Sequence, residues 1–415
     1  MKSTRLRSTV LLSLLVFGIT TGFTGCHKKR PQPVDEADIS DHYRIRVLLF
    51  KNIRRCDIES KSEMTVTDSK ATVILRKPQG KKIDIERDGD KILLDTEPCS
   101  GDITIQTVDD GIIRVNGHRY RGIVRIIANI DSGFDVINTL SVESYLDGVV
   151  GAEMPSYWEA EALKAQAVAA RTYCLYYKQK YGNDRYWDVT KTQSTQVYRG
   201  VEAETTTVKQ AVRDTYGQVM TCEYSDGIKR IFPAYYSSVC GGHTEDGVNV
   251  FGRDNFSCLT AVKCDYCKKV ARAKTFYWQD VSFSRDTVNA RLESRYNSLK
   301  TLEGISKIEI VDKGYLDRIL LVKLIGTNQK SDTIKGEDLR IAVDPTGTML
   351  KSAIFKIRDD GGQFRFYDGK GFGHGVGMCQ CGAEGMARKG SDYVEILEHY
   401  YTGMELYYLD YSKQK

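Results

Sequence analysis

Alternating polar and apolar residues dominate the first third of the chain. Residues 43–50 (YRIRVLLF) alternate at their start, as a half-buried strand does. The dipeptides Asp110-Gly111 and Asn116-Gly117 have the chemistry of hairpin turns. Further short strand candidates lie at 73–75, 83–85, 92–94, 103–107, 112–115, 124–130 and 134–140. The pattern therefore predicts a β-rich N-terminal module over residues 42–140.

The pattern becomes mixed after residue 141. An alanine-rich stretch predicts a helix over 158–181, and Ser156 and Glu159 before it have the spacing of a capping box. A helix over 286–300 and strands over 305–310 and 316–325 follow. Strands and helices lack regular βαβ spacing, which favours an α+β fold. We expect a β-rich N-terminal module followed by a mixed α+β catalytic domain over 141–415, with an inserted α+β segment at about 268–365.

The first residues have the features of an export signal. Positive residues precede an apolar run over 10–19 that is too short for a comfortable membrane span, and small residues surround Cys26. Residues 22–26 resemble a bacterial lipobox, in which the cysteine carries the lipid and each buried CH₂ contributes about 0.8 kcal/mol to anchoring. We expect a lipoprotein signal peptide at 1–26, a solvated tether at 27–41 and an exported protein anchored to the membrane through Cys26. The alternative is a secretory peptide with an incidental cysteine.

Composition and motif searches exclude several function classes. The formal charge of +5 comes without a long basic run, so nothing favours a nucleic-acid partner. The chain contains no G-x-S-x-G, H-E-x-x-H or phosphate-loop motif. Near the C-terminus, glycine recurs at every second position from Gly369 to Gly377, and this period never yields a dinucleotide-binding fingerprint. Alternate glycines indicate an extended segment with one bare face, which backbone or ligand approaches closely.

Cysteine and histidine spacing predicts a structural metal site. Cys240 and His243 form a C-x-x-H knuckle, and Cys264 and Cys267 form a C-x-x-C knuckle. Two such knuckles about twenty residues apart fit tetrahedral zinc, with Cys379 as an alternative to His243 for the fourth ligand. Disulfides, which export favours, and a redox C-x-x-C remain alternatives.

Four segments together carry a resemblance to a known family. They are Val142 to Pro155 (VESYLDGVVGAEMP), Glu161 to Tyr173 (EALKAQAVAARTY), Thr195 to Gly200 (TQVYRG) and Gly371 to Gln380 (GFGHGVGMCQ). In order and spacing they resemble the SpoIID/LytB family of cell-wall proteins, and Tyr236 to Glu245 (YSSVCGGHTE) adds a fifth match. The resemblance implies a lytic transglycosylase that cleaves peptidoglycan glycan, preferentially strands stripped of stem peptides. The family also includes proteins described as enhancers of wall amidases, so a non-catalytic protein that binds the wall and recruits an amidase is the alternative.

The resemblance places the catalytic acid at Glu153. Its apolar neighbours would raise the pKa of the carboxyl and keep it protonated near neutral pH. The competing interpretation is an anion at a helix N-terminus, and Glu143 and Asp147 are the next acids to consider. The groove-lining candidates are Gln196, Tyr198, His374 and Gln380, each with structural hydrogen bonding as the alternative role. Arg171 is expected to be buried and paired rather than catalytic. Relatives in the family have been linked to zinc, which supports the metal prediction.

Overall fold

A computed structural model describes residues 43–99, 101–129, 133–252 and 256–411. These residues are 30% helix and 35% strand, with a β-rich N-terminal part followed by mixed elements, so the predicted α+β class is confirmed. Cys26 and the predicted tether lie outside the described residues. Among the helices in the described ranges, none is both long and apolar enough to cross a membrane.

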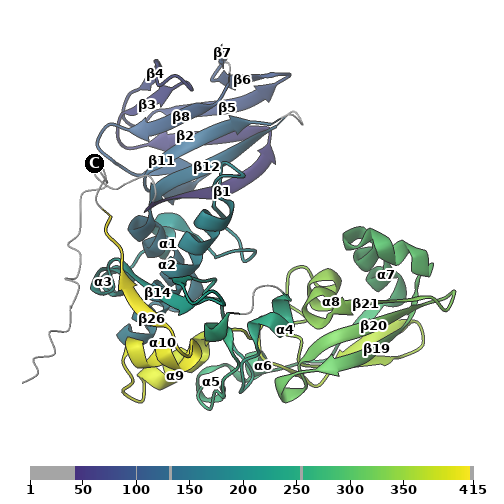
Figure 1. The fold of residues 1–415 in the computed structure, drawn as a ribbon. Helices are drawn as coiled ribbons and strands as arrows, with labels where there is room; N and C mark the ends of the chain where they lie inside the picture. The colour runs from purple at the N-terminus through teal and green to yellow at the C-terminus, as the bar shows by residue number, and fades with distance from the viewer. Residues whose placement is uncertain (1–42, 100, 130–132, 253–255, 412–415) are drawn as a thin grey trace, which may run out of the picture.

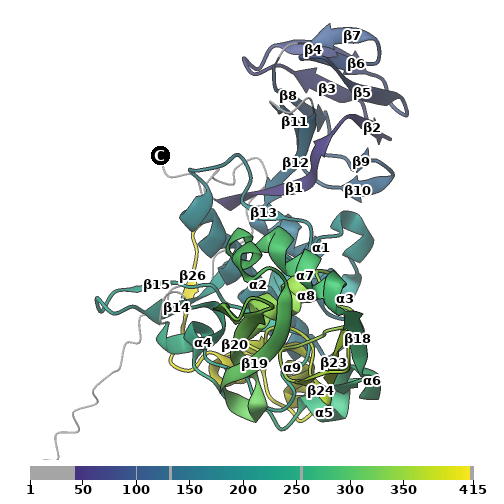
Figure 2. The same ribbon diagram turned by 90° about the vertical axis from the view of Figure 1, so that its right-hand side faces the viewer.

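The N-terminal module consists of two antiparallel sheets, with one short parallel strand added to the first (Figures 1 and 2). Alternate residues are buried in several of the strands, for example Ile103, Ile105 and Thr107 in the strand over 103–107. In spatial order, the first sheet contains β13 (Val189–Thr190), β1 (Arg44–Ile53), β12 (Phe134–Ser141), β11 (Ile123–Ala128), β8 (Ile103–Thr107), β3 (Met64–Thr67) and β4 (Val73–Lys77). The second contains β10 (His118–Tyr120), β9 (Ile113–Val115), β2 (Arg55–Ser60), β5 (Lys82–Asp88), β6 (Lys91–Leu94) and β7 (Glu97–Cys99).

One of the two predicted hairpin turns is confirmed and the other is wrong. Asn116 and Gly117, with φ of 46° and 81°, connect the paired strands β9 and β10. Positive φ at both residues is what the two-residue turn favoured by twisted strands requires. Asp110-Gly111 instead connects β8 and β9, which belong to different sheets, so this turn moves the chain between sheets. A glycine-containing dipeptide marks the turn but does not identify the strand partner.

Two helices follow the module directly. Helix α1 (Val142–Glu153) begins at Ser141, whose side chain accepts a hydrogen bond from the Ser144 N–H, and the sequence did not predict this helix. Helix α2 (Ala160–Tyr181) was predicted, but its capping box is wrong because its N-cap, Glu159, makes no side-chain cap bond. The Glu159 N–H donates to Glu384 Oε2 at 2.9 Å instead. The buried alanines of α2 allow α1, α3 (Thr206–Asp214), α9 (Gln380–Ala387) and α10 (Tyr393–Tyr400) to pack against it.

Short elements complete the main body around α2. One small sheet joins β15 (Lys229–Ile231), β14 (Gln218–Glu223) and β26 (Glu405–Tyr408), and a parallel pair joins β16 (Tyr236–Ser237) to β25 (Met378–Cys379). The remaining elements are η3 (Gly200–Ala203), α4 (Gly247–Phe251), η4 (Ser257–Leu259), α5 (Cys267–Val270), α6 (Ala273–Phe276), β17 (Tyr277–Trp278) and β24 (Gly369–Lys370). This body shares one continuous hydrophobic core with the N-terminal module.

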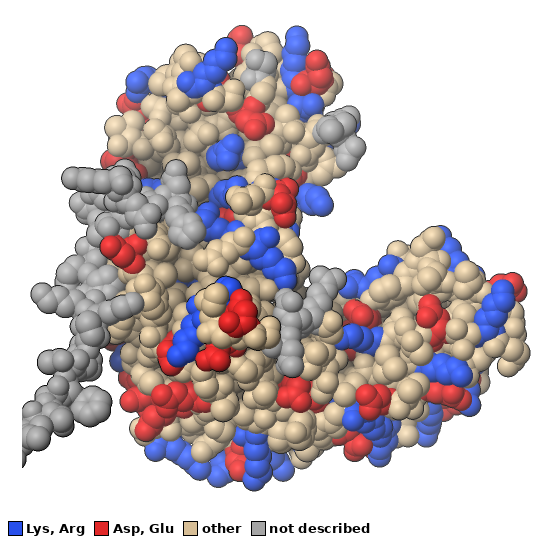
Figure 3. Space-filling model, viewed as in Figure 1, with Lys and Arg blue, Asp and Glu red and all other residues tan. Residues whose placement is uncertain are grey.

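A second hydrophobic core spans residues 278–366 and forms a separate unit that projects from the main body (Figure 1). Its elements are β18 (Val281–Ser284), α7 (Arg285–Arg295), η5 (Asn297–Leu302), β19 (Ile305–Lys313), η6 (Tyr315–Asp317), β20 (Ile319–Gly326), β21 (Ser331–Lys335), α8 (Gly336–Val343), β22 (Lys356–Asp359) and β23 (Gln363–Tyr367). Strand β20 begins three residues later than predicted because Leu316 and Asp317 turn at positive φ. Figure 3 shows that the face between this unit and the N-terminal module is hollowed.

The glycine ladder packs against the backbone before residue 242. Gly371, Gly373, Gly375 and Gly377 all have positive φ. A Cβ at Gly371 would lie 2.8 Å from the carbonyl oxygen of Val239, and one at Gly377 would lie 2.1 Å from that of Tyr235. Backbone therefore approaches closely at these two glycines, whereas side chains of Ser237 and Arg318 approach Gly373 and Gly375.

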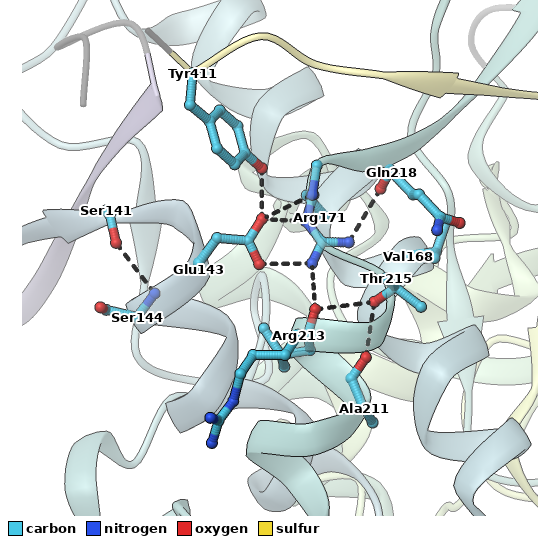
Figure 4. A network of polar contacts seen from close by, with 12 residues as sticks. Ser141, Glu143, Ser144, Val168, Arg171, Ala211, Arg213, Thr215, Gln218 and Tyr411 are labelled. Atoms are coloured by element: carbon cyan, nitrogen blue, oxygen red, sulfur yellow. Dashed lines mark hydrogen bonds and ion pairs between the residues drawn. The ribbon is translucent and has the colours of Figure 1, made fainter. Parts of the chain in front are cut away.

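Arg171 is fully buried and lies at the centre of a polar network that joins four parts of the chain (Figure 4). Its Nε and Nη2 donate to the two carboxylate oxygens of Glu143 at 2.8 and 2.7 Å. Arg171 Nη1 donates to the carbonyl of Gln218, and the Tyr411 hydroxyl donates to Glu143 Oε1 at 2.5 Å. The prediction that Arg171 is buried and paired is confirmed. The network connects α1, α2, the start of β14 and the C-terminal segment.

Replacing Glu143 by Ala is expected to destabilise the protein by about 3–5 kcal/mol, because it leaves the buried Arg171 charge without its partner. The free energy of unfolding in urea measures this loss. Glu86→Ala is the matched control, since its pair with Arg55 is solvent-exposed and contributes at most about 1 kcal/mol. Equal losses in the two variants would contradict a central role for the network.

Candidate active site and cysteine cluster

Glu153 is the last residue of α1, and Met154 caps the helix in an extended conformation (φ −125°, ψ 145°). Pro155 explains this end, because the residue before proline is disfavoured in the helical region. The interpretation of Glu153 as an anion at a helix N-terminus is therefore wrong. The carboxyl lies at the negative end of the helix dipole, which disfavours its ionised form.

Three chain segments meet at the Glu153 carboxyl. The Val197 N–H donates to Oε1 at 2.7 Å, and Gln380 Nε2, at the start of α9, makes a long contact of 3.5 Å with Oε2. Burial raises the pKa of Glu153, while hydrogen bonds from Val197, Gln380 and Tyr236 and the charge of Arg199 oppose the rise. The net direction is upward, so the carboxyl keeps a proton to higher pH than an exposed glutamate does.

Gln380 is the predicted groove residue that contacts Glu153, whereas Gln196 and Tyr198 are buried and bond to other side chains. Gln196 Nε2 donates to the Tyr236 hydroxyl at 2.9 Å, and its Oε1 accepts from the Tyr145 hydroxyl at 3.2 Å. Gln196 therefore positions Tyr236, which in turn influences Glu153.

The Tyr198 ring occupies the space that Gly148 leaves open. A Cβ on Gly148 would lie 2.5 Å from that ring, and the Tyr198 hydroxyl donates to Asn138 Oδ1 at 2.9 Å. The ring also packs against those of Tyr120 and Tyr145 at centroid distances of 5.8 and 5.1 Å. These contacts support a structural role for Tyr198, which was the alternative to lining the glycan groove.

His374 packs against Tyr235 and Phe251, at ring distances of 5.7 and 5.3 Å. Its Nδ1 accepts a hydrogen bond from the Val376 N–H at 3.0 Å, which requires that nitrogen to be unprotonated. Burial lowers the pKa of His374 to about 4. The neutral imidazole thus supports the glycine ladder in this structure.

Sequence analysis missed two residues of this site, Tyr236 and Gln166. Gln166 Oε1 accepts from Gln380 Nε2 at 3.3 Å, and its own Nε2 is buried with no partner among the described residues. A fully buried glutamine on the otherwise apolar face of an alanine-rich helix is the signal that points to it. Tyr236 lies within a family segment but has no distinguishing local pattern.

The other two acids of α1 occupy different environments. Glu143 is held by Arg171, as described above. Asp147 lies near Glu204, which is ion-paired with Arg121 and Lys209 at 2.7 and 2.6 Å. Burial, followed by the Glu204 charge, raises the pKa of Asp147 to about 7. Asp147 therefore belongs to a separate charged group from the Glu153 contacts.

Four buried cysteines, Cys240, Cys264, Cys267 and Cys379, have sulfur atoms within 4.8 Å of one another. The Cys240 and Cys267 sulfurs are 3.7 Å apart, close to the separation of about 3.8 Å that tetrahedral geometry with Zn–S bonds of about 2.3 Å gives. The backbone N–H of Cys240 donates to Cys379 Sγ at 3.2 Å, and the Tyr400 hydroxyl lies 3.1 Å from Cys264 Sγ. A closed set of four sulfurs with supporting hydrogen bonds fits a structural metal ion.

His243 is outside this cluster, which corrects its prediction as a ligand. Its Nδ1 lies 2.8 Å from the Thr244 carbonyl oxygen, and its ring stacks on Tyr315 at 4.0 Å. Cys379, the alternative fourth ligand, occupies the position instead. The ten cysteines in the described ranges are free thiols.

The cluster and the Glu153 site share two backbone segments. The parallel pair β16–β25 aligns Tyr236 with Met378 and Ser237 with Cys379. Cys379 directly precedes Gln380, so one end of this strand pair belongs to the sulfur cluster and the adjoining residues reach Glu153. The two features form one unit of structure.

Two family models match parts of this chain. A family model described as Stage II sporulation protein (SpoIID) matches residues 130–222, and a domain of unknown function, DUF8618, matches 247–377. An uncharacterized protein of Brachyspira hyodysenteriae is 36% identical over 303 residues, which are 72% of this chain and 74% of the relative. Stage II sporulation protein D of Bacillus amyloliquefaciens is 28% identical over 65% of this chain and 75% of its own length.

The Amidase enhancer of Bacillus subtilis is 30% identical over 296 residues, which are 63% of this chain and 40% of that protein. The SpoIID family model covers α1 and α2. The DUF8618 model covers most of the chain between Cys267 and Cys379. The chain belongs to the SpoIID/LytB family of cell-wall proteins.

Proposed function

We propose that this protein is a lytic transglycosylase that cleaves peptidoglycan glycan strands with Glu153 as its single acid–base residue. The observation that carries the proposal is the half-buried Glu153 carboxyl, whose raised pKa combines with contacts from segments far apart in sequence. The family assignment supports a role at the cell wall. The preferred substrate in this proposal is glycan stripped of stem peptides.

The proton path follows from the two oxygens of Glu153. Oε1 accepts from the Val197 N–H at 2.7 Å, which leaves Oε2 as the oxygen that carries the proton. That proton passes to the glycosidic oxygen as the bond to the muramic acid breaks and positive charge develops on the sugar ring. The resulting carboxylate then accepts the proton of the 6-hydroxyl of the same sugar, and the 6-oxygen closes a 1,6-anhydro ring.

This mechanism needs no second carboxylate and no attacking water, unlike ordinary glycoside hydrolysis. The structure offers no second acid beside Glu153 among the carboxylates of α1, because Glu143 pairs with Arg171 and Asp147 lies in the Glu204 group. A single carboxyl serving first as acid and then as base accounts for that arrangement.

Zinc held by Cys240, Cys264, Cys267 and Cys379 is the second part of the proposal. Bound there, it would supply structural crosslinking and no step of the reaction. It would hold β16 beside β25, and hence Tyr236 and Gln380 beside Glu153. Anchoring through a lipid on Cys26, in the cell envelope, completes the proposed arrangement.

The second candidate function is enhancement of a wall amidase without glycan cleavage. The similarity to the Amidase enhancer of Bacillus subtilis favours it. In that case the protein binds wall polymer and recruits the amidase, and Glu153 has no catalytic role. The two functions differ in whether the purified protein alone generates anhydro-muramic ends.

Glu153→Gln is expected to abolish cleavage of purified glycan strands, measured as anhydro-muramic products by mass spectrometry. Glutamine keeps an acceptor for the Val197 N–H but can neither donate a carboxylic proton nor act as the base. Acid–base groups typically contribute about 10²- to 10⁴-fold, and the loss should reach the upper end because one residue has both roles. Asp147→Asn, on the same helix, is the control and should retain activity. More than about a tenth of wild-type turnover in Glu153→Gln would refute the assignment.

The same substitution should also change the pH dependence of stability. Because the folded-state pKa of Glu153 is raised, its protonated form is favoured by folding, and this contribution is complete below the ordinary glutamate pKa of about 4.3. It is lost as pH rises through the folded pKa. Glu153→Gln should therefore melt higher than wild type at pH 7.5, with the difference shrinking towards pH 4. A variant that melts lower than wild type at both pH values would show that burial does not dominate.

One zinc ion per chain is expected by elemental analysis of the purified protein. Cys379→Ser should lower the metal content, whereas His243→Ala should leave it unchanged, since only the first removes a sulfur of the cluster. Chelation should lower the melting temperature because a structural metal contributes directly to folding. Metal-free protein with the cluster cysteines joined in disulfides would support the competing interpretation.

A further inference from the structure

A trough lies along the C-terminal half of α2, on the side of Tyr235. It consists of two adjoining cavities of about 480 and 340 Å³ that share Tyr176, Lys180 and Phe256 in their walls. The first extends towards β14 and β15, and the second towards α4 and the start of α8. Tyr235 and Phe251, which pack against His374, line it, and Glu153 and the residues that contact Glu153 are not among its lining residues.

Aromatic side chains are prominent among its lining residues. Tyr177 and Tyr181, one helical turn apart, lie 5.8 Å from each other, and the Tyr176 ring meets Phe256 edge-on at 6.1 Å. Tyr235 stacks on Phe251 at 4.3 Å. These contacts hold the rings in fixed orientations, and the tyrosines place hydroxyl groups beside apolar ring faces. Such surfaces suit ligands that have both apolar faces and polar edges.

The charged groups of the trough are mostly cationic. Lys180 and Arg230 are exposed at its edge, with Arg230 in an exposed ion pair with Asp226 that contributes little. The half-buried Lys335 donates to the carbonyls of Asn249 and Val250, so it is used within the fold. Asp338 is the acid among the lining residues. The exposed edge therefore favours an anionic ligand.

We propose that this trough is a binding site for peptide-free peptidoglycan glycan, which stacks its sugar rings on the tyrosines and pairs its lactyl carboxylates with Lys180 and Arg230. The inference rests on the proposed function and adds a second contact region to it. Sugar rings have apolar faces with hydroxyl edges, and each muramic acid without a stem peptide exposes one carboxylate. In a peptide-bearing strand that carboxyl is an amide, which has no charge for the two cations to bind.

The position of the trough supports this occupant. The Tyr173 ring lies 5.9 Å from that of Tyr235, which lines the trough, and 6.3 Å from that of Tyr236, which influences Glu153. Two rings thus separate the trough wall from the candidate acid. A strand held there would be retained close to Glu153, with charge selecting segments that an amidase has already stripped.

Binding should be measured with the full chain carrying Glu153→Gln, so that bound glycan is not consumed. The ligands are purified peptide-free glycan strands and peptide-bearing strands of the same length. In that background, Tyr176→Ala and the Lys180→Glu, Arg230→Glu double variant are each expected to weaken binding of peptide-free strands by about tenfold. Tyr176→Phe keeps the ring and should bind within about twofold of the parent. Tyr277→Ala and Lys91→Glu alter exposed groups outside the trough and serve as controls.

Charge selection gives an independent criterion. The parent should prefer peptide-free over peptide-bearing strands, the double charge variant should lose that preference, and added salt should reduce it. Unchanged affinity in both trough variants, or equal affinity of the parent for the two ligands, would overturn the proposal. Variants that bind glycan normally but fail to stimulate an amidase would show that the trough receives a protein, which also overturns it.

The outcomes separate this inference from the proposed function. If wild type produces no anhydro-muramic ends while the trough variants lose glycan binding, the enzymatic function fails and the binding site stands. If wild type cleaves glycan and the trough variants bind it normally, the function stands and the binding site fails.

Discussion

The meeting of Cys240 and Cys379, 139 residues apart in sequence, is the constraint on which the candidate site depends. The Cys240 N–H donates to Cys379 Sγ, and the neighbouring residues form the parallel pair β16–β25. Tyr236 and Gln380 are adjacent to this junction and reach Glu153 from two directions. Without it, the carboxyl would keep the Val197 hydrogen bond and the nearby charge of Arg199 but lose the contacts from Tyr236 and Gln380. A cluster of four sulfurs with no direct contact to Glu153 can therefore determine the environment of the acid.

Burial and hydrogen bonding have opposite effects on the pKa of Glu153. Burial and the C-terminal end of α1 disfavour the carboxylate, while the Val197 N–H, Gln380 and Tyr236 stabilise it. Both states are needed by a residue that first donates and later accepts a proton. A fully apolar pocket would prevent ionisation, and a stronger hydrogen-bond set would prevent protonation. Gln380 Nε2 has two N–H donors and contacts both Glu153 Oε2 and Gln166 Oε1, so Gln166 orients the amide that faces the acid.

Sequence patterns predicted the elements with period-two alternation and the motifs with local chemistry. Most strands of the N-terminal module, the hairpin at Asn116-Gly117 and three of the four cluster cysteines follow from spacing, whereas β2, β3, β7 and β10 were not predicted. Helix α1 was missed because its glycines, Gly148 and Gly151, lower helix propensity. Their actual role is to admit Tyr198 and the Ala203 carbonyl, and tertiary packing overrides the local preference.

The remaining misses concern long-range choices. A C-x-x-H knuckle and a C-x-x-C knuckle look complete by themselves, so spacing favoured His243 over a cysteine more than a hundred residues away. Likewise, Gln196 and Tyr198 are polar residues in a family segment, and sequence cannot distinguish a side chain that faces substrate from one that supports it. Contacts with Tyr145, Tyr236 and Asn138 make that distinction only once the chain is folded.

The projecting unit is also connected to the junction, through the buried guanidinium of Arg318. Arg318 Nη2 donates to the carbonyl of Cys240 at 3.0 Å, and a Cβ on Gly375 would lie 2.3 Å from the same nitrogen. Gly375 therefore has no room for a side chain, because the guanidinium of Arg318, the residue before β20, occupies that space. On the other side, Gln193 Nε2, in the loop that precedes Val197, donates to the Thr346 carbonyl at 3.2 Å. The projecting unit therefore contacts the chain close to each of the three segments that reach Glu153, at Gln193, Cys240 and Gly375.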